Sequence, residues 1–193
     1  MAVEKDVYKV AESFDKKDYT REPFPSGEYE DCRFVNCNFE KLDLTGIKFI
    51  QCEFVGCNLS ISTLLNTSLG DVFFKDCKML GLHFEQCNNF GFHVRFENCN
   101  LEHSSFYQVN LKNTSFVASA LKEVDFTQAI LAGSLFNECD LKDAKFEGTD
   151  LRKVDFRTAI NFSIDPETNK VTNAKFSSTT VGGLLDKYNI EIN

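Results

Sequence analysis

The side chains with the most evident chemistry are eight cysteines, two of which lie close to three histidines in one short stretch. Thiolates and imidazoles bind zinc, so this stretch holds a candidate metal site: His83, Cys87, His93, Cys99 and His103. Their spacings match no standard zinc finger. We therefore expect the cysteines to be small buried side chains, and the sequence predicts no metal and no cofactor.

All eight cysteines share one place in a repeat. Each stands two residues before a position of a five-residue register. That register holds Phe, Leu, Met or Tyr from Tyr29 to Phe84 and, after a two-residue slip, from Phe96 to Phe156. A helix repeats every 3.6 residues and a strand every two, so neither places every fifth side chain on one side. A chain that turns a corner every five residues does, and it coils into an all-β solenoid with both positions inside.

The large inward position alternates strictly between Phe and Leu after the slip. If four pentapeptides make one turn, successive turns place Phe over Phe and Leu over Leu. The structural residues of this prediction are Phe96, Phe116, Phe136 and Phe156, together with Gly91, which occupies a large position where the repeat is interrupted.

Both ends of a solenoid need a cover, because the last turn exposes unpaired backbone and core. Residues 1–26 are the expected N-terminal cap, with a helix over residues 3–14 whose apolar stripe is Val3, Val7, Val10 and Phe14. The repeat block spans residues 27–162. Residues 163–193 are the expected C-terminal cap and dimerisation segment, with a second helical stripe of Val181, Leu184, Leu185 and Tyr188.

Charge and motifs exclude several functions. The chain carries a net charge of −8, so phosphates would repel it and direct nucleic-acid binding is not expected. It has no glycine-rich phosphate loop, no GxSxG and no HExxH, and we expect no enzymatic activity. No apolar run is long enough to span a bilayer and the N-terminus lacks a signal-peptide core, so a cytoplasmic location is expected.

Two surface features are candidates for partner binding. Glu28, Glu30 and Asp31 cluster near the start of the repeat, and Val35 and Val55 differ by twenty residues, which places them on the same wall. Other outward positions of the first block are also apolar: Ile50, Ile61, Leu65, Phe73 and Leu80. A contiguous apolar patch marks a protein contact, although scattered apolar residues are common on β surfaces.

The pentapeptides CDLKD, TDLRK, VDFRT and CNLEH resemble those of the pentapeptide-repeat family over residues 27 to about 162. The resemblance implies a right-handed quadrilateral β-helix with short terminal capping helices. The break at Gly91 and the tail STTVGGLLDKYNIEI are most similar to the Qnr-like group. That likeness implies a homodimer joined through the tail, which mimics DNA, binds DNA gyrase or topoisomerase IV, and modulates enzyme activity or quinolone sensitivity.

The chain also departs from that group. Plasmid-borne Qnr proteins carry two loops that bulge from the coils, and a two-residue slip has room for neither. In that respect the chain is similar to loopless relatives that inhibit gyrase. Mimicry requires the acidic residues to gather on one face. The alternative is a structural interaction rod that binds an unrelated protein through the apolar positions of the first block.

Overall fold

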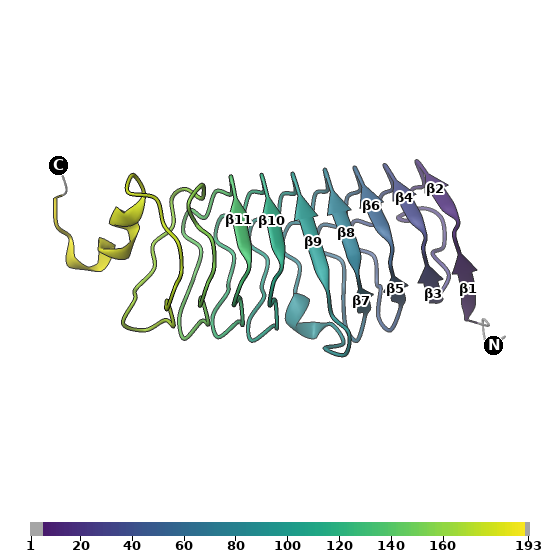
Figure 1. Ribbon diagram of the computed structural model, residues 1–193. Coiled ribbons are helices and arrows are strands. Elements are labelled where there is room, and N and C mark those ends of the chain that lie inside the picture. The colour runs from purple at the N-terminus through teal and green to yellow at the C-terminus, as the bar shows by residue number, and fades with distance from the viewer. Residues whose placement is uncertain (1–5, 192–193) are drawn as a thin grey trace.

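The computed structural model describes residues 6–191, which form a single parallel β-solenoid with a short C-terminal tail. Figure 1 shows the coils stacked into a rod with the two termini at opposite ends. The strands are β1 (Val7–Val10), β2 (Ser13–Asp15), β3 (Gly27–Glu30), β4 (Arg33–Val35), β5 (Lys48–Ile50), β6 (Glu53–Val55), β7 (Ser68–Gly70), β8 (Val72–Lys75), β9 (Val94–Glu97), β10 (Ser115–Val117) and β11 (Leu135–Asn137). Three short 3-10 helices accompany them: η1 (Phe84–Gln86), η2 (Val181–Leu184) and η3 (Asp186–Tyr188). The predicted all-β solenoid is confirmed.

The coils present four faces. The first face is the sheet β1-β3-β5-β7, continued by bridges through Asn110, Ile130, Asp150 and Lys170; the second is the seven-stranded sheet from β2 to β11. The third and fourth faces are held by isolated bridges, which include Asn100–Ala120 and Asp125–Lys145 respectively. On every face, three columns point outward: the residues just before, just after and two after each large inward position.

The corners explain the period of five. The residue two positions after most large residues has a positive φ, such as 52° at Asn36 and 77° at Gly133. At many corners the large residue's carbonyl accepts a hydrogen bond from the amide three residues later, as in Leu42 N to Phe39 O (3.0 Å). A positive φ at the third residue of such a turn is the type II pattern. Ile61 (φ 59°) is the least suited of these corner residues, because its β-branched side chain disfavours this conformation.

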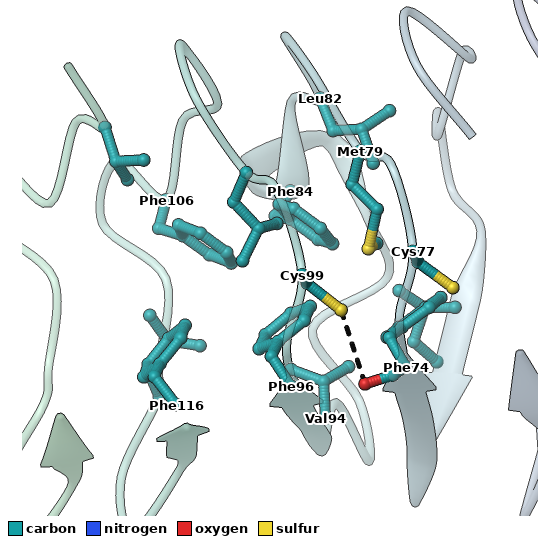
Figure 2. Close-up of a cluster of buried hydrophobic side chains, with 14 of the residues drawn as sticks. Phe74, Cys77, Met79, Leu82, Phe84, Val94, Phe96, Cys99, Phe106 and Phe116 are labelled. Carbon is teal, nitrogen blue, oxygen red and sulfur yellow. Dashed lines mark hydrogen bonds between the residues drawn. The ribbon is translucent and has the colours of Figure 1, made fainter. Parts of the chain in front are cut away.

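Stacked phenylalanines fill the core behind the second face. Eight successive pairs have ring centroids 4.7–5.5 Å apart and interplanar angles of 6–21°. The predicted stacking is confirmed, and the ladder is longer than predicted: Phe14, Phe34, Phe54, Phe74, Phe96, Phe116, Phe136, Phe156 and Phe176. Figure 2 shows Phe74, Phe96 and Phe116 from this ladder, opposite Phe84 and Phe106. The core therefore continues unbroken past the two-residue slip.

The N-terminal helix predicted over residues 3–14 is wrong. Val3 lies outside the described residues, and the rest of the segment forms β1 and β2. Strand β1 pairs with β3, and the ring of Phe14 stacks on Phe34 at 4.8 Å. A short helix is marginal alone, so pairing with the next coil decides the structure. The first coil thus begins at Val7, inside the predicted cap.

The C-terminal tail forms the 3-10 helices η2 and η3 instead of one regular helix. Two consecutive glycines, Gly182 and Gly183, stand inside η2, and glycine disfavours a longer helix. Within residues 6–191, no helix has the length and apolar character needed to cross a membrane.

Candidate interaction surfaces

The eight cysteines are all buried and unpaired by disulfides. Seven of the thiols donate to carbonyls of the preceding coil, as in Cys57 Sγ to Phe34 O and Cys139 Sγ to Phe116 O, both at 3.4 Å. Hydroxyls at the same inward position do likewise, as in Ser134 Oγ to Leu111 O at 2.7 Å. Burial raises the pKa of the Cys139 thiol to about 12, so this thiol stays protonated near neutral pH. The position holds small or aliphatic buried side chains, some of which donate hydrogen bonds to the preceding coil, and the cysteines are structural.

The five residues of the zinc candidate do not converge. Cys87 and Cys99 point into the core, and Figure 2 shows Cys99 bonded to the Phe74 carbonyl. Each histidine lies at the surface with its Nδ1 near a carboxylate: His83 with Glu85 (2.8 Å), His93 with Asp71 (2.7 Å) and His103 with Glu123 (3.3 Å). In the described part of the chain, no group of three or more His, Cys, Asp or Glu side chains is placed to hold a metal ion.

The fourth face gathers carboxylates. Its outward columns, named here the acidic stripe, hold Asp43, Glu85, Asp125, Glu147, Asp165 and Glu167. Against these six, the same columns contain one basic residue, Lys145, which leaves a net charge of −5. The second face carries six acidic and six basic residues and the third six and five. Sequence reasoning missed the stripe, although aligning the chain in steps of twenty residues would have found it.

Hydrogen bonds favour the ionised form of three carboxyls at the two ends of the stripe. The Thr45 hydroxyl and amide donate to Asp43, and these bonds lower the pKa of that carboxyl. Lys187 of the tail lies 2.8 Å from Asp165 and 2.7 Å from Glu167, and its hydrogen bonds lower the pKa of both groups. One end of the stripe is therefore tied to the tail and Glu85 is engaged by His83, whereas Asp125 and Glu147 form no ion pair among the described residues.

The predicted acidic cluster lies on the first face, and two of its carboxylates contact side chains of neighbouring coils. Lys48 Nζ lies 3.2 Å from Glu28, and the Tyr8 hydroxyl donates a hydrogen bond to Glu30. Asp31 is exposed at a corner with φ 52°. The structure therefore brings the three carboxylates together, with two of them engaged by neighbouring coils.

The predicted apolar positions do not form one wall. Val35 and Val55 pair in register between β4 and β6, as predicted. Phe73 shares their face, whereas Ile50 lies on the first face and Leu65 on the fourth. A single contiguous patch over the first block is therefore absent from the described coils, and Val35 with Val55 remains a small local surface.

The interruption at Gly91 is a bulge on the first face. Asn88 Nδ2 bonds Ser68 Oγ, twenty residues away, while Val94 pairs with Val72, a spacing of twenty-two. The two extra residues project Phe90, which is 90% exposed. Sequence reasoning placed the slip correctly and missed the exposed ring.

Inside the bulge, Gly91 has φ 69° and brings no side chain to the core. Phe92 packs against the core instead, with its ring 6.5 Å from that of Phe84 in an edge-on arrangement. One inward ring therefore replaces the missing large residue, and the neighbouring ring of Phe90 is left in solvent.

The tail covers the last coil and presents apolar side chains outward. The amide of Ile164 donates to Gly183 O at 2.9 Å, and Leu184 packs against the core. The other predicted dimerisation residues are exposed: Val181 (42%), Leu185 (37%) and Tyr188 (52%). The segment is thus a cap on its own subunit with an apolar outer surface.

The observed architecture agrees with comparisons to known proteins. A family model described as "Pentapeptide repeat region" matches residues 28–89 and 92–160, and the gap between the two matches falls at the Phe90–Gly91 bulge. No curated protein matches the chain.

The solved structures of QnrB1 share the fold. Full-length QnrB1, described as a plasmid-mediated fluoroquinolone resistance protein, is 18% identical with a TM-score of 0.62, covering 94% of this chain and 99% of that one. A trypsin-treated QnrB1 variant is also 18% identical with a TM-score of 0.62, covering 98% of this chain and 100% of that one. HetL of the cyanobacterium Nostoc, described as involved in heterocyst differentiation regulation, is 12% identical with a TM-score of 0.39. The match covers 91% of this chain and 90% of that one. At 18% identity the likeness to QnrB1 establishes the right-handed quadrilateral β-helix and leaves function to the surfaces.

Proposed function

This chain belongs to the pentapeptide-repeat family, and we propose that it binds DNA gyrase, or the related topoisomerase IV, as a protein mimic of DNA. In this role it performs no chemistry and modulates the enzyme or its sensitivity to quinolones. The acidic stripe is the observation that carries the proposal. A partner that normally binds phosphates meets carboxylates on one flat face of a rod, with few competing cations.

The charge density supports mimicry of one DNA strand. The stripe runs from Asp43 to Glu167 over seven coils, whose six steps rise about 30 Å at roughly 4.8 Å each. One DNA strand of that length carries about nine phosphates, and both strands carry about 18. Six carboxylates are two thirds of a single strand's charge. The stripe therefore fits a binding groove that contacts one phosphate backbone at a time.

Pairing of two subunits through the tail would lengthen the stripe. The exposed Val181, Leu185 and Tyr188 lie at the C-terminal end of the rod, where a two-fold axis would join two tails. Such a dimer presents the two stripes along a rod of twice the length. Light scattering at micromolar concentration measures this directly, and a monomer mass would contradict the dimer.

A second candidate function is that of an interaction rod for an unrelated protein. Phe90 favours it, because a 90% exposed ring on a rigid bulge is an apolar anchor without a partner in its own chain. Binding through Phe90 would persist at high salt, whereas binding through the acidic stripe would weaken.

The experiment is DNA supercoiling by gyrase with this protein titrated in, with and without a fluoroquinolone. Three proteins are compared: the wild type, a stripe variant (Asp125→Lys with Glu147→Lys), and a control of equal charge change on other faces (Glu138→Lys with Asp143→Lys). We expect inhibition, or rescue from the drug, with the wild type and the control and neither with the stripe variant.

Two results would count against DNA mimicry. One is no effect of the wild type on several bacterial gyrases. The other is an equal loss in both charge variants, which would indicate a general effect of net charge. If Phe90→Ser, added as a fourth protein, alone lost the effect, gyrase binding would lie at the bulge and not at the stripe.

A further inference from the structure

The first face contains a second charged feature, opposite in sign to the acidic stripe. Its outward columns hold Glu28, Glu30, Asp31 and Asp71 before the bulge, with Lys48 as the one cation. After the bulge they hold Lys112, Arg152, Lys153 and Lys170, with Asp150 as the one anion. A chain of net charge −8 thus concentrates four cations on half of one face.

Three of these cations surround a trough. A hollow of about 270 Å³ is lined by Lys112, Asn113, Ala132, Gly133, Arg152 and Lys153. These residues occupy the same two columns on three successive coils, as the bonds Asn113 N to Ala132 O (3.1 Å) and Gly133 N to Arg152 O (2.9 Å) show. The middle coil contributes only small residues, so the flanking cations stand two coils apart, roughly 10 Å.

The floor of the trough depends on Gly133. Its φ is 77°, and a Cβ there would lie 2.4 Å from Asn113 Oδ1. Any side chain at this corner would therefore both strain the backbone and displace Asn113. Together with Ala132, this glycine keeps the space between the two flanking coils open.

The cations are arranged to receive an anion. Asp150 accepts bonds from Arg152 Nε (2.8 Å) and Nη2 (2.6 Å), which fixes the guanidinium at one edge and leaves further N–H donors. Lys112 and Lys153 are exposed, and among the described residues neither forms an ion pair, unlike Lys122, Lys175 and Lys187. After Asp150 is counted, the trough keeps a net charge of +2.

We propose that this trough binds the phosphate group of a small soluble molecule. A planar guanidinium and two flexible ammonium groups around an open floor match the several oxygens and multiple charge of phosphate better than a single carboxylate. Duplex DNA is disfavoured as the ligand, because the whole chain is acidic and would repel it at longer range. The trough lies on a different face from the acidic stripe, so it does not depend on gyrase binding.

The test is an amide-resolved NMR titration of the full chain with sodium pyrophosphate, against sodium chloride of equal ionic strength. We expect saturable shifts confined to the amides of residues 112–113, 132–133 and 152–153. A trough variant (Lys112→Gln with Lys153→Gln) removes two of its cations. A control variant (Lys122→Gln with Lys142→Gln) makes the same charge change on the third face.

The outcomes separate clearly. Saturable shifts that persist in the control and weaken at least tenfold in the trough variant support the site. Shifts that follow ionic strength, spread over the cations of all faces, or survive in the trough variant would overturn it. A duplex oligonucleotide at equal phosphate concentration is the third arm, and shifts at the trough with duplex alone would also overturn the small-molecule assignment.

Discussion

The coils before and after Gly91 have the same backbone and fill their interiors differently. After the bulge each wall keeps one residue type, with Phe stacked on the second and fourth faces and Leu on the first and third. Before it, the fourth face reads Phe24, Leu44, Leu64 and Phe84. A cavity of about 10 Å³ lies there, bounded by these leucines and neighbouring rings. The five-residue period thus sets the path of the chain, whereas repetition every twenty residues sets how well the core is filled.

The surfaces of the two halves differ as well. The first face is acidic before the bulge and basic after it, while the acidic stripe of the fourth face runs through both halves. A solenoid holds its outward columns in fixed register whatever residues they carry. Surface chemistry can therefore change from coil to coil without altering the fold, and we place the function there.

Removal of one ring from the regular half should have the largest effect. Phe116 is fully buried and stacks on Phe96 (5.2 Å) and Phe136 (4.8 Å). We expect Phe116→Ala to lower the free energy of unfolding by about 3–5 kcal/mol in urea. The matched control, Phe90→Ala at the exposed bulge, should change it by less than about 0.5 kcal/mol. Similar losses in both variants would contradict the assigned burial.

Enlarging one leucine in each half tests the difference in packing. Leu131 lies in a uniform Leu column of the second half, and we expect Leu131→Phe to destabilise by about 1–3 kcal/mol through overpacking. Leu64 borders the small cavity, so Leu64→Phe should cost less than about 1 kcal/mol. Urea unfolding compares the two, and a larger cost at Leu64 would argue against looser packing in the first half.

The corners of the third face give a smaller contrast. Ile61 has φ 59° in the first half, whereas His103, Glu123 and Asp143 occupy the same column in the second. Ile61→Asn should raise stability by about 1 kcal/mol, because asparagine tolerates this conformation better than a β-branched residue. His103→Asn is the control and should change stability by less than about 0.5 kcal/mol. A lower melting temperature for Ile61→Asn would show that its side chain contributes contacts that outweigh the strain.

The smallest effect concerns the tail at the end of the regular half. Lys187 lowers the pKa of Asp165 and Glu167 from ordinary values of 3.8 and 4.5. Because these pKa values are lower when the tail is docked, the contribution is complete above the ordinary values and is lost as pH falls through the lowered ones. The Ile164 amide, bonded to Gly183, should therefore lose NMR hydrogen-exchange protection below about pH 4. Lys187→Gln should flatten this change, and an unaltered pH profile in that variant would exclude the ion pairs as its cause.

Much of this fold can be predicted from the sequence because the two inward positions each recur every five residues and always lie two residues apart. The ladder through Phe96, Phe116, Phe136 and Phe156 follows from that spacing alone. The N-terminal coil was missed because Val7, Val10 and Phe14 also fit a helical stripe, and the charged Lys9 and Glu12 stand where the repeat expects inward residues. Only pairing with the next coil distinguishes the two structures.

The surfaces were harder to predict for a different reason. Block totals of charge average over four faces, so they conceal both the acidic stripe and the cationic trough. At the bulge, Phe90 and Phe92 are chemically identical, and the local sequence does not say which ring turns inward. That choice depends on the space that Gly91 leaves beside Phe84.

Displacement of a fluorescently labelled DNA duplex from gyrase tests most directly whether the acidic stripe takes the place of DNA. We predict that the wild-type protein and the Glu138→Lys/Asp143→Lys control displace the duplex, less effectively as salt rises, and that the Asp125→Lys/Glu147→Lys variant does not. Displacement by all three proteins alike, or by none, would contradict the proposed role of the stripe.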